Sequence, residues 1–191
     1  MTTITDIELS RKEYLTLPET EWRKDYFDEA TGGYVATHKM KTPDDMSILG
    51  IAAEVNACYE MASIGKHVLR LPENIPELIN NITISGKPYC DLLKYKPNET
   101  VPRGYPDAYF DGRTWDFKVS KSRKEDTLRQ LIKDGRKADN LVFITDNESQ
   151  IIRIQHALER ELGRRINSGT WLELPDTYCL FNRVLIKIWS K

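Results

Sequence analysis

Every second residue between positions 115 and 119 is apolar, and this alternation predicts a β-strand. The apolar side chains fall on one face of that strand, while Asp116 and Lys118 fall on the other. The dipeptide Asp111-Gly112 lies just before the strand, and Asp-Gly tolerates the positive φ angles of a tight turn. We therefore expect a hairpin whose second strand places an acid and an amine side by side.

The clearest helical pattern runs from residue 43 to residue 65. Ile51, Val55, Cys58 and Ala62 recur at a spacing that places them on one side of a helix. Gly65 stands where a helix-terminating glycine is typical. The same reading predicts further helices over residues 123–139 and 150–165, and strands over residues 66–71, 140–145 and 178–189.

Glycine-containing turns predict two further strand segments. Gly32-Gly33 leads into a strand that ends at His38, and a second hairpin is expected around Gly86-Lys87. Residues 1–25 have the pattern of a polar, weakly helical arm. The resulting order along the chain predicts an α/β (α+β) fold, in which helices flank a mixed β-sheet.

Composition indicates a protein with one sizeable core. The chain has 191 residues, of which 40% are hydrophobic and 30% charged. The formal net charge is −1, so a basic surface for nucleic acid would have to be local. The three cysteines lie far apart without metal-ligand spacing, which suits a reducing compartment. No stretch has membrane length or the pattern of an export signal, so we expect a cytoplasmic protein without a membrane partner.

The predicted hairpin carries a second acid, because Asp107 follows Pro106 at the start of its first strand. Two nearby carboxylates repel each other unless a divalent cation lies between them, and such an ion can activate water toward a phosphoryl group. Lys118 can orient that water or stabilise charge in the transition state. The hairpin therefore favours phosphodiester hydrolysis. In the competing interpretation Asp107 caps a turn, and Asp116 and Lys118 form the solvated face of an edge strand.

Other polar residues each admit two interpretations. Glu54, beside the apolar stripe of the first helix, is either a boundary charge or an active-site acid. His38 is either a packed or solvated residue or an acid–base catalyst. Basic residues after the hairpin form either a solvated face or an electrostatic track for a phosphate backbone; they are Lys121, Arg129, Lys133, Arg136 and Lys137.

Pro106-Asp107 followed by Asp116-Phe117-Lys118 resembles the signature of the PD-(D/E)XK nuclease superfamily. Further segments are similar to C-terminal toxin domains of contact-dependent inhibition (CdiA-type) systems and to related phage and mobile-element nucleases; they are residues 25–35, His38, residues 65–73, Asp111-Gly112 and residues 138–139. The resemblance covers most of residues 25–145 and implies an αβββαβ nuclease core.

This resemblance implies an endonuclease that hydrolyses phosphodiester bonds of RNA, with tRNA as the first choice, or of DNA. Asp107, Asp116 and Glu54 would then bind Mg²⁺ (or Mn²⁺ or Zn²⁺), and Lys118 would position the attacking water. Nucleic acid is the implied partner, and an immunity or inhibitor protein is a further one. Residues 1–40 would form an N-terminal arm and strand, and residues 41–191 a nuclease-like domain with an insertion at about 74–103.

The chain departs from the family pattern at two places. Asp116 stands where glutamate is commoner, and the insertion before the acidic hairpin is longer than expected. Two other functions therefore stay open. One is a metal-independent, barnase-like RNase in which His38 and Lys118 carry the acid–base work. The other is a catalytically inactive nucleic-acid-binding or phage structural module.

Overall fold

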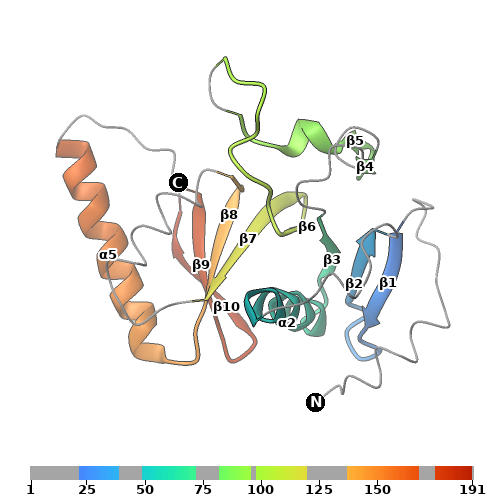
Figure 1. Cartoon of the computed structure of the whole chain (residues 1–191). Coiled ribbons are helices and arrows are strands. Elements are labelled where there is room, and N and C mark those ends of the chain that lie inside the picture. Colours follow the sequence, from blue (N-terminus) through green and yellow to red (C-terminus); the bar gives the residue numbers. More distant parts are fainter. Residues whose placement is uncertain are drawn as a thin grey trace. The chain divides into compact units, whose positions relative to one another are not determined.

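The computed structural model describes residues 22–38, 49–71, 82–95, 98–119, 137–167 and 175–190. The chain forms two compact units. Unit 1 comprises residues 1–92 and 105–114, and unit 2 comprises residues 93–104 and 115–191. Each unit combines mixed β-strands with one described α-helix, as Figure 1 shows. The expected combination of helices with mixed β-structure is thus confirmed.

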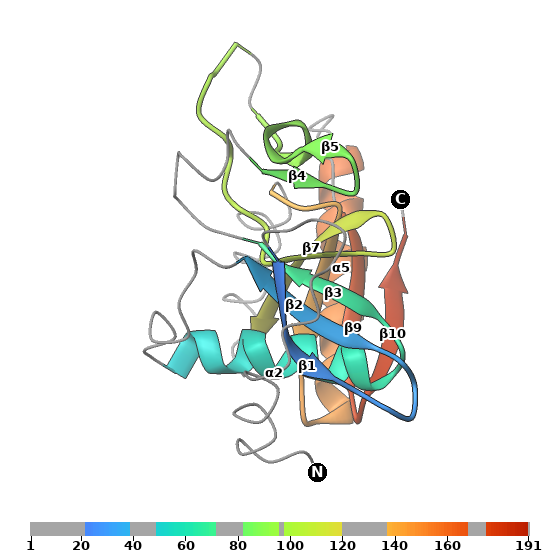
Figure 2. The same cartoon turned by 90° about the vertical axis from the view of Figure 1, so that its right-hand side faces the viewer.

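Among the described residues of unit 1, four strands belong to its larger sheet. β1 (Trp22–Phe27) pairs with β2 (Tyr34–His38) in antiparallel fashion, and β2 runs parallel to β3 (His67–Arg70), which pairs in antiparallel fashion with β6 (Ala108–Phe110). Helix α2 (Leu49–Ser63) connects the two parallel strands and packs on both of them (Figure 2). A parallel pair needs such a crossover, because a short turn cannot return the chain to the same end of the sheet.

Helix α2 ends as its glycine predicts. Gly65 has a φ of 89°, and its N–H donates to the carbonyl of Ala62. The N–H of Lys66 donates to the carbonyl of Met61, so two of the last helical carbonyls receive the bonds of a Schellman motif. The hydroxyl of Thr31 also donates to the Ala62 carbonyl, at 3.1 Å. The turn before β2 is therefore fastened to the end of the helix.

The segment between β3 and β6 contains a small second sheet within unit 1. Strands β4 (Thr83–Ile84) and β5 (Lys87–Pro88) form a hairpin that is followed by the 3₁₀ helix η2 (Tyr89–Leu92). The predicted hairpin exists, but its turn lies one residue earlier, at Ser85-Gly86, where both φ angles are positive.

Unit 2 contains the continuation of β7 (Arg113–Val119) from Trp115 onward. β7 runs parallel to β8 (Asn140–Ile144), and β8 runs parallel to β9 (Asp176–Phe181). The last strand, β10 (Val184–Trp189), is antiparallel to β9. The expected buried strand over residues 140–145 is thereby confirmed.

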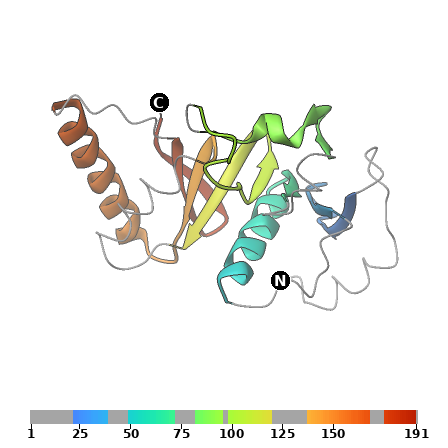
Figure 3. The ribbon, with the colours of Figure 1, turned by 45° about the horizontal axis from the view of Figure 1, so that its top comes forward.

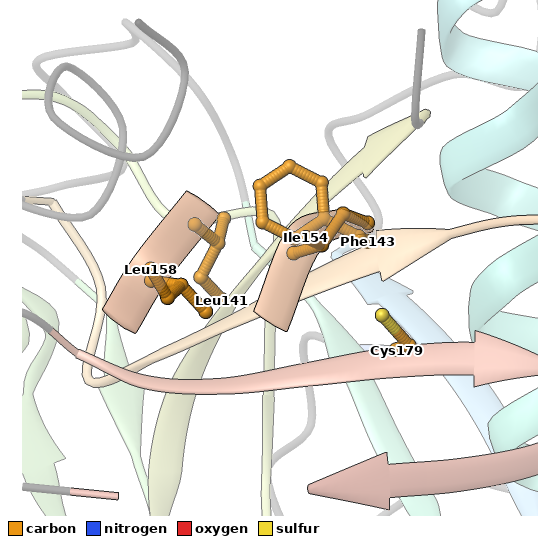
Figure 4. Close-up of a cluster of buried hydrophobic side chains, with 5 residues drawn as sticks. All are labelled: Leu141, Phe143, Ile154, Leu158 and Cys179. Carbon is orange, nitrogen blue, oxygen red and sulfur yellow. The ribbon is translucent and has the colours of Figure 1, made fainter. Parts of the chain in front are cut away.

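Helix α5 (Glu148–Asn167), whose course Figure 3 shows, contributes to the apolar core of unit 2. Its Ile154 and Leu158 meet Leu141 and Phe143 of β8, and Figure 4 shows these side chains together with Cys179 of β9. The helix predicted over residues 150–165 is confirmed. Because Leu141 and Phe143 alternate along β8, they identify the sheet face that α5 covers.

Three predicted boundaries are wrong. The single strand expected over residues 178–189 is a hairpin, because Asn182 and Arg183 both take positive φ angles between β9 and β10. The weakly helical arm expected over residues 1–25 gives way to strand β1 at Trp22. The helix expected over residues 123–139 does not include residues 137–139, which form a turn and a bend before β8. Its earlier part, residues 120–136, lies outside the described residues, as do residues 1–21 and 39–48.

Within the described ranges, no helix combines the length and apolar character needed to span a bilayer.

Replacing Gly33 by alanine should destabilise the protein by about 3 kcal/mol, because the new methyl group would overpack a rigid contact. A Cβ at this position would lie 1.8 Å from the backbone oxygen of Ala62. Gly163 of α5 is the matched control, since a Cβ there meets nothing within 4 Å. Gly163→Ala should stabilise the helix by about 0.5–1 kcal/mol. Urea unfolding of both variants measures the difference, and equal stabilities would contradict the packing of β2 against α2.

Because the thiol of Cys179 is buried, we predict that the protein loses stability at alkaline pH. Burial raises its pKa from 9.0 to about 12. The unfolded chain therefore releases this proton at a lower pH than the folded chain, and the free energy of unfolding should fall as the pH rises from 9 toward 12. Cys179→Ala removes this contribution, so its unfolding free energy should fall less steeply between pH 9 and 10. Identical slopes for the two proteins would contradict the prediction.

Candidate functional site

The turn that leads into the candidate site has the predicted conformation. Asp111 and Gly112 have φ angles of 52° and 73°, as a two-residue hairpin turn between β6 and β7 requires. Lys66 Nζ donates to Oδ2 of Asp111 at 2.6 Å, which ties this turn to the residue before β3. The strand that follows carries Asp116 and Lys118.

Asp116 lies on the face of the unit 2 sheet that α5 covers. In the parallel pairing of β7 with β8, Asp116 stands opposite Leu141 and Lys118 stands opposite Phe143. Paired residues of neighbouring strands point to the same face, and Leu141 and Phe143 belong to the core under α5. Asp116 is therefore a charged residue at the border of an apolar cluster, and its side chain is 0% exposed.

Two ammonium groups neutralise this buried carboxylate. Lys137 Nζ lies 2.7 Å from Oδ1 of Asp116, and Lys118 Nζ lies 3.3 Å from Oδ2. The lysine side chains are 16% and 22% exposed, respectively, whereas the carboxylate is not exposed. An ionised carboxylate in such a place would be costly without these partners. We call these three side chains the Asp116 cluster.

Two residues of the segment 93–104 lie against Lys137 or against the two residues that follow it. Gly104 lies under the lysine stem, because a Cβ on this glycine would come within 3.0 Å of Lys137 Cδ and 3.2 Å of its Cβ. Lys94 Nζ donates to the carbonyl of Ala138 at 2.6 Å and lies 3.3 Å from a carboxylate oxygen of Asp139. This part of the predicted insertion therefore belongs to unit 2, where it contacts the residues just before β8.

The pairing of Asp116 with Lys118 agrees with their predicted placement on one face of the strand. Asp107 lies directly before β6, is buried, and accepts the N–H of Leu71 through its backbone carbonyl. Glu54 lies on α2 and is partly buried. Both belong to unit 1, so their predicted convergence with Asp116 stays a prediction.

The structure says less about the other predicted site residues. His38 ends β2, as expected, and its catalytic role stays a prediction. The predicted nucleic-acid-binding residues lie outside the described residues; they are Lys121, Arg129, Lys133 and Arg136. Among the residues that the structure does describe, no three histidine, cysteine, aspartate or glutamate side chains gather into a metal-binding group.

Lys137 is the member of the cluster that sequence reasoning missed. Its charge suggested only a basic helix face, whereas the structure places it in a turn with its amine on Asp116. The useful signal was its position just before a buried strand. Recognising the contact also required the parallel pairing of that strand with β7, which joins residues distant in sequence.

No protein-family model, curated protein or solved structure matches the chain. The function proposed below therefore depends on the residues themselves.

Burial should make the Asp116–Lys137 pair energetically stronger than a shorter but more exposed one. A double-mutant cycle of Asp116→Asn and Lys137→Met should give a coupling of about 1–3 kcal/mol. The control is the Lys66–Asp111 pair, where the atoms are 2.6 Å apart but the side chains are 34% and 50% exposed. Its cycle, with Lys66→Met and Asp111→Asn, should give less than about 1 kcal/mol. Chemical unfolding provides the free energies, and a weaker coupling at Asp116 would contradict this account.

Proposed function

We propose that this chain is a PD-(D/E)XK-type endonuclease that hydrolyses phosphodiester bonds of RNA or DNA. The observation that carries the proposal is the contact between Lys118 and the buried carboxylate of Asp116, on the strand that follows the Asp111-Gly112 turn. A lysine that a carboxylate holds in one position can act on a phosphate group without first being ordered.

The order of elements also supports this proposal. Along the chain, α2 is followed by β3, β6 and β7, and then by β8, which runs parallel to β7. This order agrees with the first four elements and the last strand of an αβββαβ core. The acid-bearing strand β7 would be the third strand of that core, where the resemblance puts Asp116 and Lys118.

The two residues would have different tasks. The ammonium of Lys118 is partly exposed, so it can donate to a phosphate oxygen and stabilise the negative charge that develops there. The carboxylate of Asp116 is fully buried in this arrangement, and its task is to orient the amines. Hydrolysis adds water across the P–O bond, and the leaving oxygen takes up a proton.

A divalent cation does not fit the Asp116 cluster as it stands. Both carboxylate oxygens contact ammonium groups, so a cation could reach either oxygen only by displacing an amine. Mg²⁺, Mn²⁺ or Zn²⁺ would require one lysine to move and further carboxylates, for which Asp107 and Glu54 stay predictions. No step of the proposed reaction is therefore assigned to a metal.

The same observation favours a second candidate function, a metal-independent RNase. The amine of Lys118, which contacts the buried carboxylate, can supply positive charge to a phosphate without a metal. Lys118 would then act with a separate acid–base group, for which His38 is the candidate. Cleavage in the presence of a chelator separates this function from the metal-dependent one.

Partners and biological setting are part of the proposal. Nucleic acid is the proposed partner, with Lys121, Arg129, Lys133 and Arg136 as its further contacts. A toxin-like or mobile-element role and an immunity or inhibitor protein rest on the resemblance alone.

The test is incubation of the chain with tRNA, total RNA, plasmid DNA and single-stranded DNA, each with Mg²⁺ and with chelator. We expect at least one substrate to be cleaved. Lys118→Met should slow cleavage at saturating substrate by about 100-fold or more, the typical cost of removing one donor to transition-state charge.

Lys187→Met is the matched control, because Lys187 also pairs with an aspartate, Asp176, at 3.0 Å but lies on β10 outside the cluster. This variant should cleave as the wild type does. Absence of cleavage in every condition, or full activity of Lys118→Met, would contradict the proposed function.

A further inference from the structure

We propose that one face of the unit 1 sheet binds the bases of a single-stranded nucleic acid. The surface consists of three aromatic rings and an ammonium group, which we call the aromatic row; they belong to Lys24 and Phe27 of β1, Tyr34 of β2 and His67 of β3. The proposal rests on the proposed function only for the choice of nucleic acid as the partner, and it places the contact outside the Asp116 cluster.

The strand register brings the three rings into line. Phe27 stands opposite Tyr34 in the antiparallel pairing of β1 with β2, and Tyr34 stands opposite His67 in the parallel pairing of β2 with β3. Paired residues share a face, so the rings cross neighbouring strands that lie about 4.8 Å apart. The rings of Tyr34 and His67 are stacked, with centroids 4.4 Å apart.

A β-bulge in β1 adds the ammonium group to this face. The register of β1 against β2 shifts between Lys24 and Tyr26, which marks one extra residue in β1. Regular alternation would put Lys24 and Phe27 on opposite faces of the sheet, and the extra residue puts them on the same one. Lys24 Nζ accordingly lies 4.4 Å from the ring centroid of Tyr34 and 5.4 Å from that of Phe27. Bulges often re-aim a side chain in this way next to a functional site.

The aromatic row lies on the face that is turned away from α2. Tyr26, whose side chain points to the other face, contacts Tyr59 of α2, with ring centroids 5.1 Å apart. In the row, by contrast, Phe27 is 47% exposed and His67 is also exposed. A large apolar side chain that meets solvent on an edge strand invites association, so its presence beside further rings indicates a binding surface.

Aromatic rings beside a cation fit a nucleotide. Any base can stack on an aromatic ring, and a neighbouring ammonium group attracts the phosphates of the same strand. The bases of a duplex are already stacked on one another, so the rings select a single strand. An apolar protein partner would gain from Phe27 but not from the charge of Lys24, and charge complementarity therefore favours nucleic acid.

The experiment measures binding of a fluorescent single-stranded DNA of about ten nucleotides by anisotropy, in chelator and at several salt concentrations. A gel verifies that the strand stays intact. An abasic strand of the same length and a duplex of the same sequence are the comparison probes. The single strand should bind more tightly than the abasic strand, because the two carry the same phosphates and differ in their bases.

The variants separate stacking from charge. Phe27→Leu should weaken binding of the single strand about fivefold or more, the cost of losing one stacked base, and should leave binding of the duplex unchanged. Phe27→Trp should retain the affinity, because it keeps an aromatic ring. Lys24→Gln should reduce the slope of log affinity against log salt by about 0.7, the contribution of one phosphate contact with a single strand.

Unit 2 supplies two matched controls. Tyr95 is another aromatic residue at the surface, 38% exposed, and Lys187 is another lysine over a tyrosine ring, with Nζ 5.6 Å from the centroid of Tyr178. Tyr95→Leu and Lys187→Gln should bind the single strand as the wild type does. Thermal unfolding verifies that each variant folds. If Phe27→Leu does not fold, the abasic comparison and the salt slope of Lys24→Gln decide the question.

The outcomes separate this proposal from the proposed function. Base-dependent binding through Phe27 without any cleavage would leave the aromatic row standing and overturn the nuclease. Cleavage by the wild type, with unchanged single-strand affinity in Phe27→Leu, would overturn the aromatic row alone. Equal binding of the single strand and the abasic strand would also overturn it, as would a dimer that Phe27→Leu dissociates, since a second copy of the chain would then cover the rings.

Discussion

A carboxylate that leaves water must meet positive charge or hydrogen-bond donors inside the protein, and in unit 2 this constraint falls on Asp116. Its strand partner Leu141 belongs to the apolar core under α5, so the sheet cannot form without bringing the charge to the border of that core. The lysines on either side compensate for the lost hydration. Burial thus gives the three side chains a defined arrangement, whereas the same residues on an open surface would sample many.

Local chemistry explains which parts of the fold could be predicted. Gly65 and Asp111-Gly112 take positive φ angles, and both were placed from residue type alone. The turn at Asn182-Arg183 was missed, because arginine rarely adopts a positive φ and the flanking strands resemble one long apolar run. The sequence pattern predicts an arm at Trp22, since the strand there is defined by pairing with β2 rather than by its own neighbours.

In the candidate site, too, local residue patterns predict some contacts and not others. Asp116 and Lys118 are two residues apart on one strand, so alternation alone predicts that they share a face. Alternation also suggested that this face meets solvent. Its burial depends instead on α5, and the second amine comes from Lys137 through a parallel strand pairing. Contacts of this kind depend on topology, which short-range patterns do not encode.

The order of synthesis has a consequence for how the Asp116 cluster arises. Every described strand of unit 1 lies before residue 115, whereas β8, α5, β9 and β10 all follow it. Lys137 leaves the ribosome 21 residues after Asp116, a delay of roughly 1–4 s at typical translation rates. During this interval the carboxylate has neither its second amine nor the helix that covers it. The Asp116 cluster is therefore completed late in translation, after Lys137 and the helix α5 have been synthesised.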